Sequence, residues 1–144
     1  MKKSLLILLA IFLTTSIFTS CDKDNPQLLS DFVIGTWQSQ ELVLGDSPFG
    51  TFTAVIKTNN KYVLTFTMTT SDGTQSITSP ETGYSIDEDK SQIIITQPDF
   101  EPNDGVTPTD TQTFDVAWTV GGNTMTWTPI GGSDAPTLQW TRGD

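Results

Sequence analysis

The 144-residue sequence contains no histidine, a single cysteine and few basic residues. Without histidine there is no Ser-His-Asp triad, no Cys-His dyad and no imidazole ligand for a metal ion. Because Cys21 is the only cysteine, the chain has no intrachain disulfide and no thiolate zinc site. Seven Lys and Arg face seventeen Asp and Glu, and the formal net charge of −10 argues against binding nucleic acid. The length allows one ordinary domain.

The chain begins with an apolar segment that has a basic start. Lys2 and Lys3 precede an apolar core from Leu5 to Phe18, which is shorter than the ~20 residues that a membrane-spanning helix needs. We therefore interpret residues 1–20 as a signal peptide that is absent from the mature protein. Its removal takes away two basic residues and no acidic residue, so the mature chain carries a net charge of −12.

The residues before Cys21, Phe18-Thr19-Ser20, resemble the lipobox of bacterial lipoprotein signal peptides, in which Leu is usual at the first position. The resemblance implies that Cys21 becomes the acylated N-terminus. Each buried CH₂ contributes about 0.8 kcal/mol, so several acyl chains give effectively permanent membrane attachment. We expect a lipid-anchored protein of the bacterial cell envelope, at the outer membrane and on its periplasmic or surface face, with inner-membrane retention as the alternative because Asp22 follows Cys21. The alternative is an ordinary secretory signal with Cys21 after its cleavage site.

The mature chain divides into a tether and one folded domain. We expect the lipidated cysteine and a flexible tether over residues 21–29, since Asp22 to Pro26 contains no apolar residue. Residues 30–144 are expected to form the folded domain. At the junction, apolar residues recur at a spacing that predicts one short helical turn: Leu28, Leu29, Phe32 and Val33.

From Thr36 onward apolar and polar residues alternate, and this period of two is typical of strands with one buried and one wet face. Turn residues such as Asn59-Asn60 separate the runs. The pattern predicts an all-β fold, and an antiparallel up-and-down β-barrel is favoured because closure leaves no free strand edges. We expect eight to nine short strands, over residues 36–44, 51–57, 61–70, 74–79, 82–87, 91–97, 111–120, 123–129 and 136–142.

Two short motifs carry a family resemblance. Gly35-Thr36-Trp37 resembles the Gly-x-Trp motif that opens the lipocalins, and Thr82-Gly83-Tyr84-Ser85-Ile86 resembles a segment of the small bacterial lipocalin-like lipoproteins. The resemblance covers most of residues 30–142 and implies a barrel that is closed at one end by Gly35, Trp37 and an overlying Arg142. A solvated terminal Arg142 is the alternative. The chain departs from the family in its shorter mature length and in lacking the usual disulfide.

The alternation places nine large side chains on the expected inner face of the barrel. An eight-stranded barrel is just wide enough either to be filled by side chains or to hold one small ligand. Nine large residues in so short a chain favour a packed core, and a ligand cavity is the alternative. The candidate ligand-binding residues are Phe52, Tyr62, Leu64, Phe66, Met68, Phe114, Trp118, Trp127 and Trp140.

The longest break in the pattern, residues 98–110, is an acidic loop. Its carboxylates, Asp99, Glu101, Asp104 and Asp110, offer the oxygen ligands that Ca²⁺ prefers. However, the glycine comes one place late for an EF-hand loop, and no helices flank the segment. The alternative is a plain acidic loop at the mouth of the barrel. We expect no metal ion and no other cofactor.

These features favour a non-catalytic, monomeric, lipid-anchored lipocalin-like protein that binds a small apolar or amphipathic ligand in its barrel. An enzyme is not expected, since no nucleophile–base pair is visible. The alternative is a packed barrel that acts as an interaction module or enzyme inhibitor. It would bind an envelope protein partner through its loops, and the acidic charge would suit a basic partner.

Overall fold

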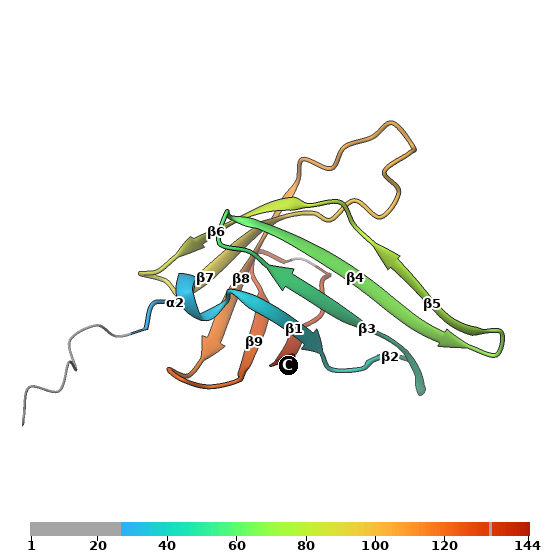
Figure 1. Ribbon diagram of the computed structural model, residues 1–144, viewed down its shortest axis with the longest axis horizontal. Coiled ribbons are helices and arrows are strands. Elements are labelled where there is room, and N and C mark those ends of the chain that lie inside the picture. Colours follow the sequence, from blue (N-terminus) through green and yellow to red (C-terminus); the bar gives the residue numbers. More distant parts are fainter. Residues whose placement is uncertain (1–26, 133) are drawn as a thin grey trace, which may run out of the picture.

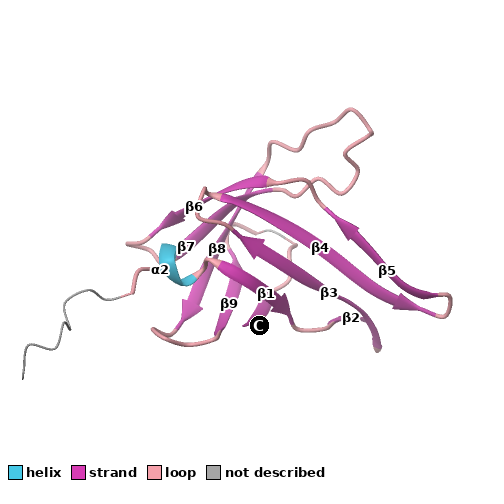
Figure 2. Ribbon diagram, in the orientation of Figure 1, coloured by secondary structure: helices cyan, strands magenta, loops and turns pink. Residues whose placement is uncertain are grey.

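The computed structural model describes residues 27–132 and 134–144 (Figures 1 and 2). The expected signal peptide, Cys21 and most of the expected tether lie outside these residues. None of the described helices is long and apolar enough to cross a membrane. The described elements are α2 (Leu29–Phe32), β1 (Gly35–Ser39), β2 (Leu42–Leu44), β3 (Ser47–Ile56), β4 (Lys61–Thr70), β5 (Gly73–Thr78), β6 (Thr82–Asp87), β7 (Gln92–Thr96), β8 (Thr111–Trp118), β9 (Thr124–Pro129) and β10 (Leu138–Arg142).

Eight of the strands close into an antiparallel barrel. They follow the order β3-β1-β10-β9-β8-β7-β6-β4, and a β3–β4 pairing closes the circle. The seam between the two ends of the domain is the β1–β10 pair, in which Trp37 lies opposite Arg142. The alternation places the core as expected: in β8, Phe114 and Val116 are buried while Asp115 is exposed. The predicted all-β, up-and-down barrel with a short N-terminal helical turn is confirmed.

The barrel carries an extension that the sequence did not predict. β3 and β4 have ten residues each and run past the barrel as a long hairpin, flanked by β2 and β5 (Figure 1). We call β2, β5 and the outer halves of β3 and β4 the extension. The prediction of one strand over 36–44 was wrong, because β1 ends at Ser39 and the chain then pairs with β3 as β2.

Two buried serines mark the points where the extension leaves the barrel. Ser39 at the end of β1 and Ser79 after β5 are 6 % and 3 % exposed. The Ser39 hydroxyl accepts a hydrogen bond from the Phe52 N–H at 2.8 Å, and the Ser79 hydroxyl accepts one from the Leu64 N–H at 3.1 Å. Each hydroxyl also donates to the carbonyl of the following residue. The serines thus satisfy backbone groups that the interrupted ladders would otherwise leave unpaired.

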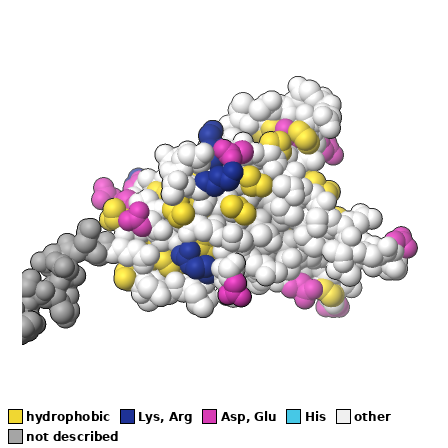
Figure 3. All heavy atoms as spheres, in the orientation of Figure 1, with side chains coloured by type: hydrophobic (Ala, Val, Ile, Leu, Met, Phe, Trp, Pro, Cys, Tyr) yellow, Lys and Arg dark blue, Asp and Glu magenta, His cyan; other side chains and the backbone are white. Residues whose placement is uncertain are grey.

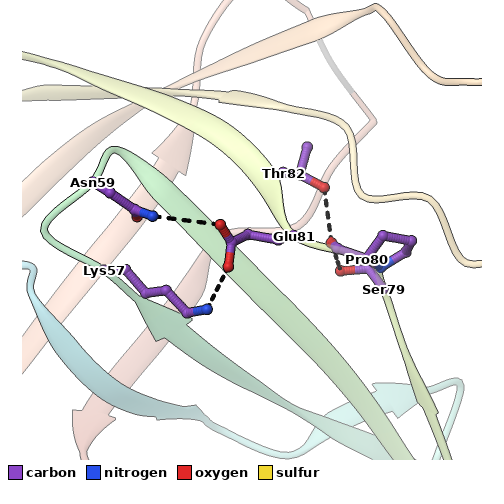
Figure 4. A network of polar contacts seen from close by, with 6 residues as sticks. All are labelled: Lys57, Asn59, Ser79, Pro80, Glu81 and Thr82. Atoms are coloured by element: carbon purple, nitrogen blue, oxygen red, sulfur yellow. Dashed lines mark hydrogen bonds and ion pairs between the residues drawn. The ribbon is translucent and has the colours of Figure 1, made fainter.

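Polar contacts hold the break between β5 and β6 against the β3–β4 turn (Figure 4). The Glu81 carboxylate pairs with the Lys57 ammonium and accepts a 3.5 Å hydrogen bond from the Asn59 amide. The Thr82 hydroxyl donates to the Pro80 carbonyl at 3.0 Å. Both partners of the ion pair are exposed to solvent, so the pair orients the segment but adds little to stability.

Candidate ligand-binding cavity

One end of the barrel is closed by an aromatic and cationic plug. Trp37 is fully buried, and its indole N–H donates to the Val33 carbonyl at 2.7 Å. The guanidinium carbon of Arg142 lies 4.3 Å from the centroid of the Trp37 ring and 5.4 Å from that of Phe32, which is cation–π geometry. The structure therefore brings Trp37 and Arg142 together in the arrangement that the lipocalin resemblance implies.

Arg142 also ties the last strand to the segment before β1. Its Nη1 donates to the Ile34 carbonyl at 2.8 Å and its Nη2 donates to the Phe32 carbonyl at 2.6 Å. Gly35 lies beneath the guanidinium with φ at +134°, and a Cβ at this position would come within 2.8 Å of Nη1. Only glycine combines this backbone conformation with such a close approach. Gly35, Trp37 and Arg142 therefore act as one structural unit, which we call the closed end.

The helix α2 covers the closed end and is capped from a distant turn. The carboxylate of Glu88 accepts hydrogen bonds from the backbone N–H groups of Leu29 at 2.9 Å and Ser30 at 2.8 Å. Burial raises the pKa of Glu88, but the hydrogen bonds from Ser30 and Leu29 outweigh it and hold the pKa below its ordinary value. Leu29, expected as the last tether residue, is buried in the helix.

The other end of the barrel holds a cavity of about 440 Å³ that opens to solvent. Its volume lies within the range of small-molecule sites. The described barrel is therefore partly hollow. The walls are formed by Phe52, Ala54, Tyr62, Leu64, Ile95, Phe114, Trp127, Leu138 and Trp140, and residues of the β7–β8 and β9–β10 connections and the start of β8 complete the lining: Gln97, Pro98, Gln112, Asp134, Ala135 and Pro136.

Six of the nine candidate ligand-binding residues line this cavity, and three lie elsewhere. Trp118 packs on Phe32 at the closed end, with ring centroids 4.7 Å apart. Met68 is half-buried near the outer end of β4. Phe66 lines a separate groove of about 270 Å³ on the extension, the extension groove, whose lining is Leu42, Phe49, Phe52, Phe66, Ile77 and Phe100.

The cavity wall carries polar atoms but few charges. The Tyr62 hydroxyl donates to the Thr96 carbonyl, and burial raises the pKa of this phenol, which stays neutral. The Trp127 indole N–H lies 3.2 Å from the Met125 sulfur. Among the buried side-chain nitrogen and oxygen atoms of the described residues, only Nε1 of Trp140 has no hydrogen-bond partner. Asp134 is the one acidic residue of the described lining, which contains no Lys or Arg.

The acidic loop does not gather its carboxylates into a metal site. The Asp99 carboxylate accepts from the Glu101 N–H at 3.0 Å, and that of Asp104 accepts from the Val106 N–H at 2.7 Å. Each of these two carboxylates therefore stabilises a local turn by accepting a hydrogen bond from the N–H two residues further along the chain. In the part of the chain that the structure describes, no group of three or more His, Cys, Asp or Glu residues is arranged to hold a metal ion. Asp110 and Glu101 thus join no such cluster.

Glu88 and Asp134 are the residues that the sequence did not single out. Glu88 lies 59 residues from Leu29, which it caps, so no local pattern links the two. Asp134 precedes β10 in a Gly- and Pro-containing connection that reads as an ordinary loop. Comparisons with known protein families, characterised proteins and solved structures find no match to this chain. The barrel and its cavity are therefore the features from which a function can be inferred.

Proposed function

We propose that this protein is a non-catalytic, lipid-anchored, lipocalin-like protein of the bacterial cell envelope that binds a small apolar or amphipathic ligand in its barrel. The cavity of about 440 Å³ carries this proposal. The lipobox-like segment ending at Cys21 supports the anchor. Gly35-Thr36-Trp37 and the contact between Trp37 and Arg142 support the lipocalin-like assignment.

The geometry suits retention of a ligand rather than its conversion. Aromatic and aliphatic walls stabilise an apolar guest by about 25 cal/mol for each Å² of apolar surface removed from water. The closed end supplies a rigid floor, and the two long connections at the mouth provide adaptable contacts. Tyr62 is neutral and already hydrogen-bonded, so it is poorly placed to act as an acid or base.

The test fills the cavity and measures uptake of an apolar fluorescent dye by the full-length protein. Leu64 lines the cavity, and we expect Leu64→Trp to weaken dye binding by about tenfold or more. The matched control is Val55→Trp, because Val55 is 37 % exposed and lies on the neighbouring strand outside the cavity. The control should bind as the wild type does. Unchanged binding by a folded Leu64→Trp variant would contradict the proposal.

A second candidate function is docking of an envelope protein partner, which exposed apolar side chains on the extension favour. Val43, Leu44, Phe49 and Ile77 are each at least 45 % exposed and lie on β2, β3 and β5, and clustered apolar exposure is typical of interaction surfaces. Cross-linking in whole cells should then give an adduct that Phe49→Ser and Ile77→Ser remove. The control is Val120→Ser, because Val120 is exposed but lies in the β8–β9 connection, away from the extension. This variant should still form the adduct.

A further inference from the structure

The connections at the two ends of the barrel differ sharply in charge. Within the described residues, those on the side of the open mouth contain seven acidic and no basic residues: Glu41, Asp46, Asp99, Glu101, Asp104, Asp110 and Asp134. Asp72 lies farther away, in the β4–β5 turn at the tip of the extension. All four described basic residues, Lys57, Lys61, Lys90 and Arg142, lie in or beside turns or strand ends on the side of α2. The acidic residues on that side are Asp31, Glu81, Asp87, Glu88, Asp89 and Asp144, so its net negative charge is much smaller. On the face shown in Figure 3, Lys and Arg lie over this part and none lies over the extension.

This asymmetry reaches the cavity itself. Asp134 contributes to its lining, and Gln97 and Gln112 are its other hydrophilic residues. Neither the cavity nor the extension groove includes a Lys or Arg in its described lining. An anionic head group at this mouth would therefore meet carboxylates with no counter-charge nearby, whereas a cation would be attracted by their summed field.

The walls also favour a cation. Five of them are aromatic, and the rings of Phe114, Trp127 and Trp140 form a contiguous row, with centroids 5.5 Å and 5.0 Å apart. Aromatic ring faces carry partial negative charge, and organic ammonium ions are attracted to them. The row provides a surface for the apolar body of a ligand and is compatible with positive charge close to that body.

We infer that the ligand is an organic cation with an apolar body: a protonated or quaternary amine whose hydrophobic part lies in the cavity and whose ammonium group lies at the mouth beside Asp134. The inference rests on the proposed function and adds the sign of the head group. Fatty acids and other anionic amphiphiles are the class that it excludes.

The test compares three water-soluble probes of matched shape: 4-phenylbutylamine, 4-phenylbutan-1-ol and 4-phenylbutanoate. Binding to the full-length protein in neutral-lipid nanodiscs is measured by calorimetry at neutral pH, with empty nanodiscs as the blank. We expect the amine to bind about tenfold more tightly than the carboxylate at low ionic strength, with the alcohol between them. The preference should shrink in about 0.5 M salt, because charges at an open mouth are screened.

Variants locate the effect. Asp134→Asn should weaken binding of the amine roughly threefold and leave the alcohol unchanged, and Asp134→Lys should reverse the order of amine and carboxylate. Asp72→Asn, in the distant β4–β5 turn, is the matched control and should bind all three probes as the wild type does. Leu64→Trp should abolish binding of all three, which excludes loose counter-ion binding to the acidic surface.

The outcomes separate the two proposals. Binding of the alcohol together with equal affinities for all probes, or with a preference for the carboxylate, would overturn the inference about the head group and leave the cavity proposal standing. Failure of the wild type to bind any of the three would contradict both. An amine preference that Asp134→Asn does not reduce would also overturn the assignment to this mouth.

Discussion

A single side chain joins three parts of the closed end. Arg142 belongs to β10 and lies over the ring of Trp37 in β1. It also donates hydrogen bonds to two carbonyls of the segment that precedes β1. Those carbonyls come from residues more than 100 positions away in the chain. The guanidinium suits this role because its planar fork donates to two acceptors while its face covers a ring.

We predict that Arg142→Ala lowers the free energy of unfolding by about 2–4 kcal/mol, since charged hydrogen bonds to two part-buried carbonyls are lost with the ring contact. Urea denaturation followed by tryptophan fluorescence measures the loss. Arg142→Lys should recover only part of it, because one ammonium cannot reproduce both hydrogen bonds and the stacking. A wild-type midpoint for Arg142→Ala would show that the plug contributes little.

At the level of single residues, the sequence pointed to the residues of the closed end but not to Glu88, whose carboxylate caps α2. Trp37 was singled out because it belongs to the Gly35-Thr36-Trp37 motif, and Arg142 because it is the only arginine in the sequence. Glu88 sits in an acidic turn, Asp87-Glu88-Asp89, where any of the three carboxylates reads as solvated. Which of them reaches α2 depends on how the β6–β7 turn packs against the helix, and that is a tertiary property.

The β3–β4 hairpin is shared between the barrel and the extension. Its inner half forms part of the barrel, and its outer half pairs with β2 and β5. The sequence could not show where one ends, because Phe66 and Met68 continue the same alternation as Tyr62 and Leu64. An alternation with a period of two shows which face of the sheet a side chain is on. It does not show whether that face lines the barrel interior or the extension.

We predict that Ser79→Ala lowers the free energy of unfolding by about 1–3 kcal/mol, because the Leu64 N–H loses its acceptor in a buried position. Urea denaturation is again the measurement. Ser76→Ala is the control: its hydroxyl contacts Thr67 on the exposed surface of the same hairpin, and its loss should stay within about 0.5 kcal/mol. Equal effects of the two substitutions would show that the buried serine has no special role.

The cap on α2 makes a prediction for pH. Because the folded state holds the pKa of Glu88 below its ordinary value, the stabilisation from its carboxylate is complete above the unfolded-state pKa and is lost as the pH falls through the lower folded-state pKa. Glu88→Gln should therefore be less stable than the wild type at pH 7, and the gap should narrow on acidification below about pH 4.3.

Denaturation midpoints between pH 7 and pH 2.5 measure that gap. Asp89→Asn serves as the control, since it removes a charge from the same turn and leaves both hydrogen bonds to α2 in place. Its stability relative to the wild type should show no comparable narrowing. A constant difference between Glu88→Gln and the wild type across this range would contradict the role assigned to the cap.

For the whole molecule, alternation and turn residues predicted the closed barrel, whereas the cavity could not be predicted. Whether a barrel of this width is hollow depends on how side-chain volumes add up inside it. Nine large residues in so short a chain favoured a filled interior, and the cavity of about 440 Å³ corrects that expectation. Space remains because Phe66, Met68 and Trp118 lie outside the cavity, in the extension and at the closed end.

The proposed anchor predicts how the protein behaves in cells. We expect the wild type to sediment with membranes and to show, by intact mass spectrometry, a chain that starts at Cys21 and carries acyl groups. Cys21→Ser should move the protein to the soluble fraction, because its −12 charge gives it no attraction to anionic lipid surfaces. A Cys21→Ser variant that still sediments with membranes would contradict acylation as the basis of attachment.

The hydrogen bond between the Gln27 side chain and the Gly121 N–H, 3.0 Å long, fixes the start of the described chain beside the β8–β9 turn and α2. Cys21 precedes Gln27 by six residues, which span at most about 20 Å when extended. With the proposed acylation, the attachment point would lie within about 20 Å of the closed end, at the opposite end of the barrel from the cavity mouth. The proposed ligand would then reach the cavity from the side of the barrel opposite the attachment point.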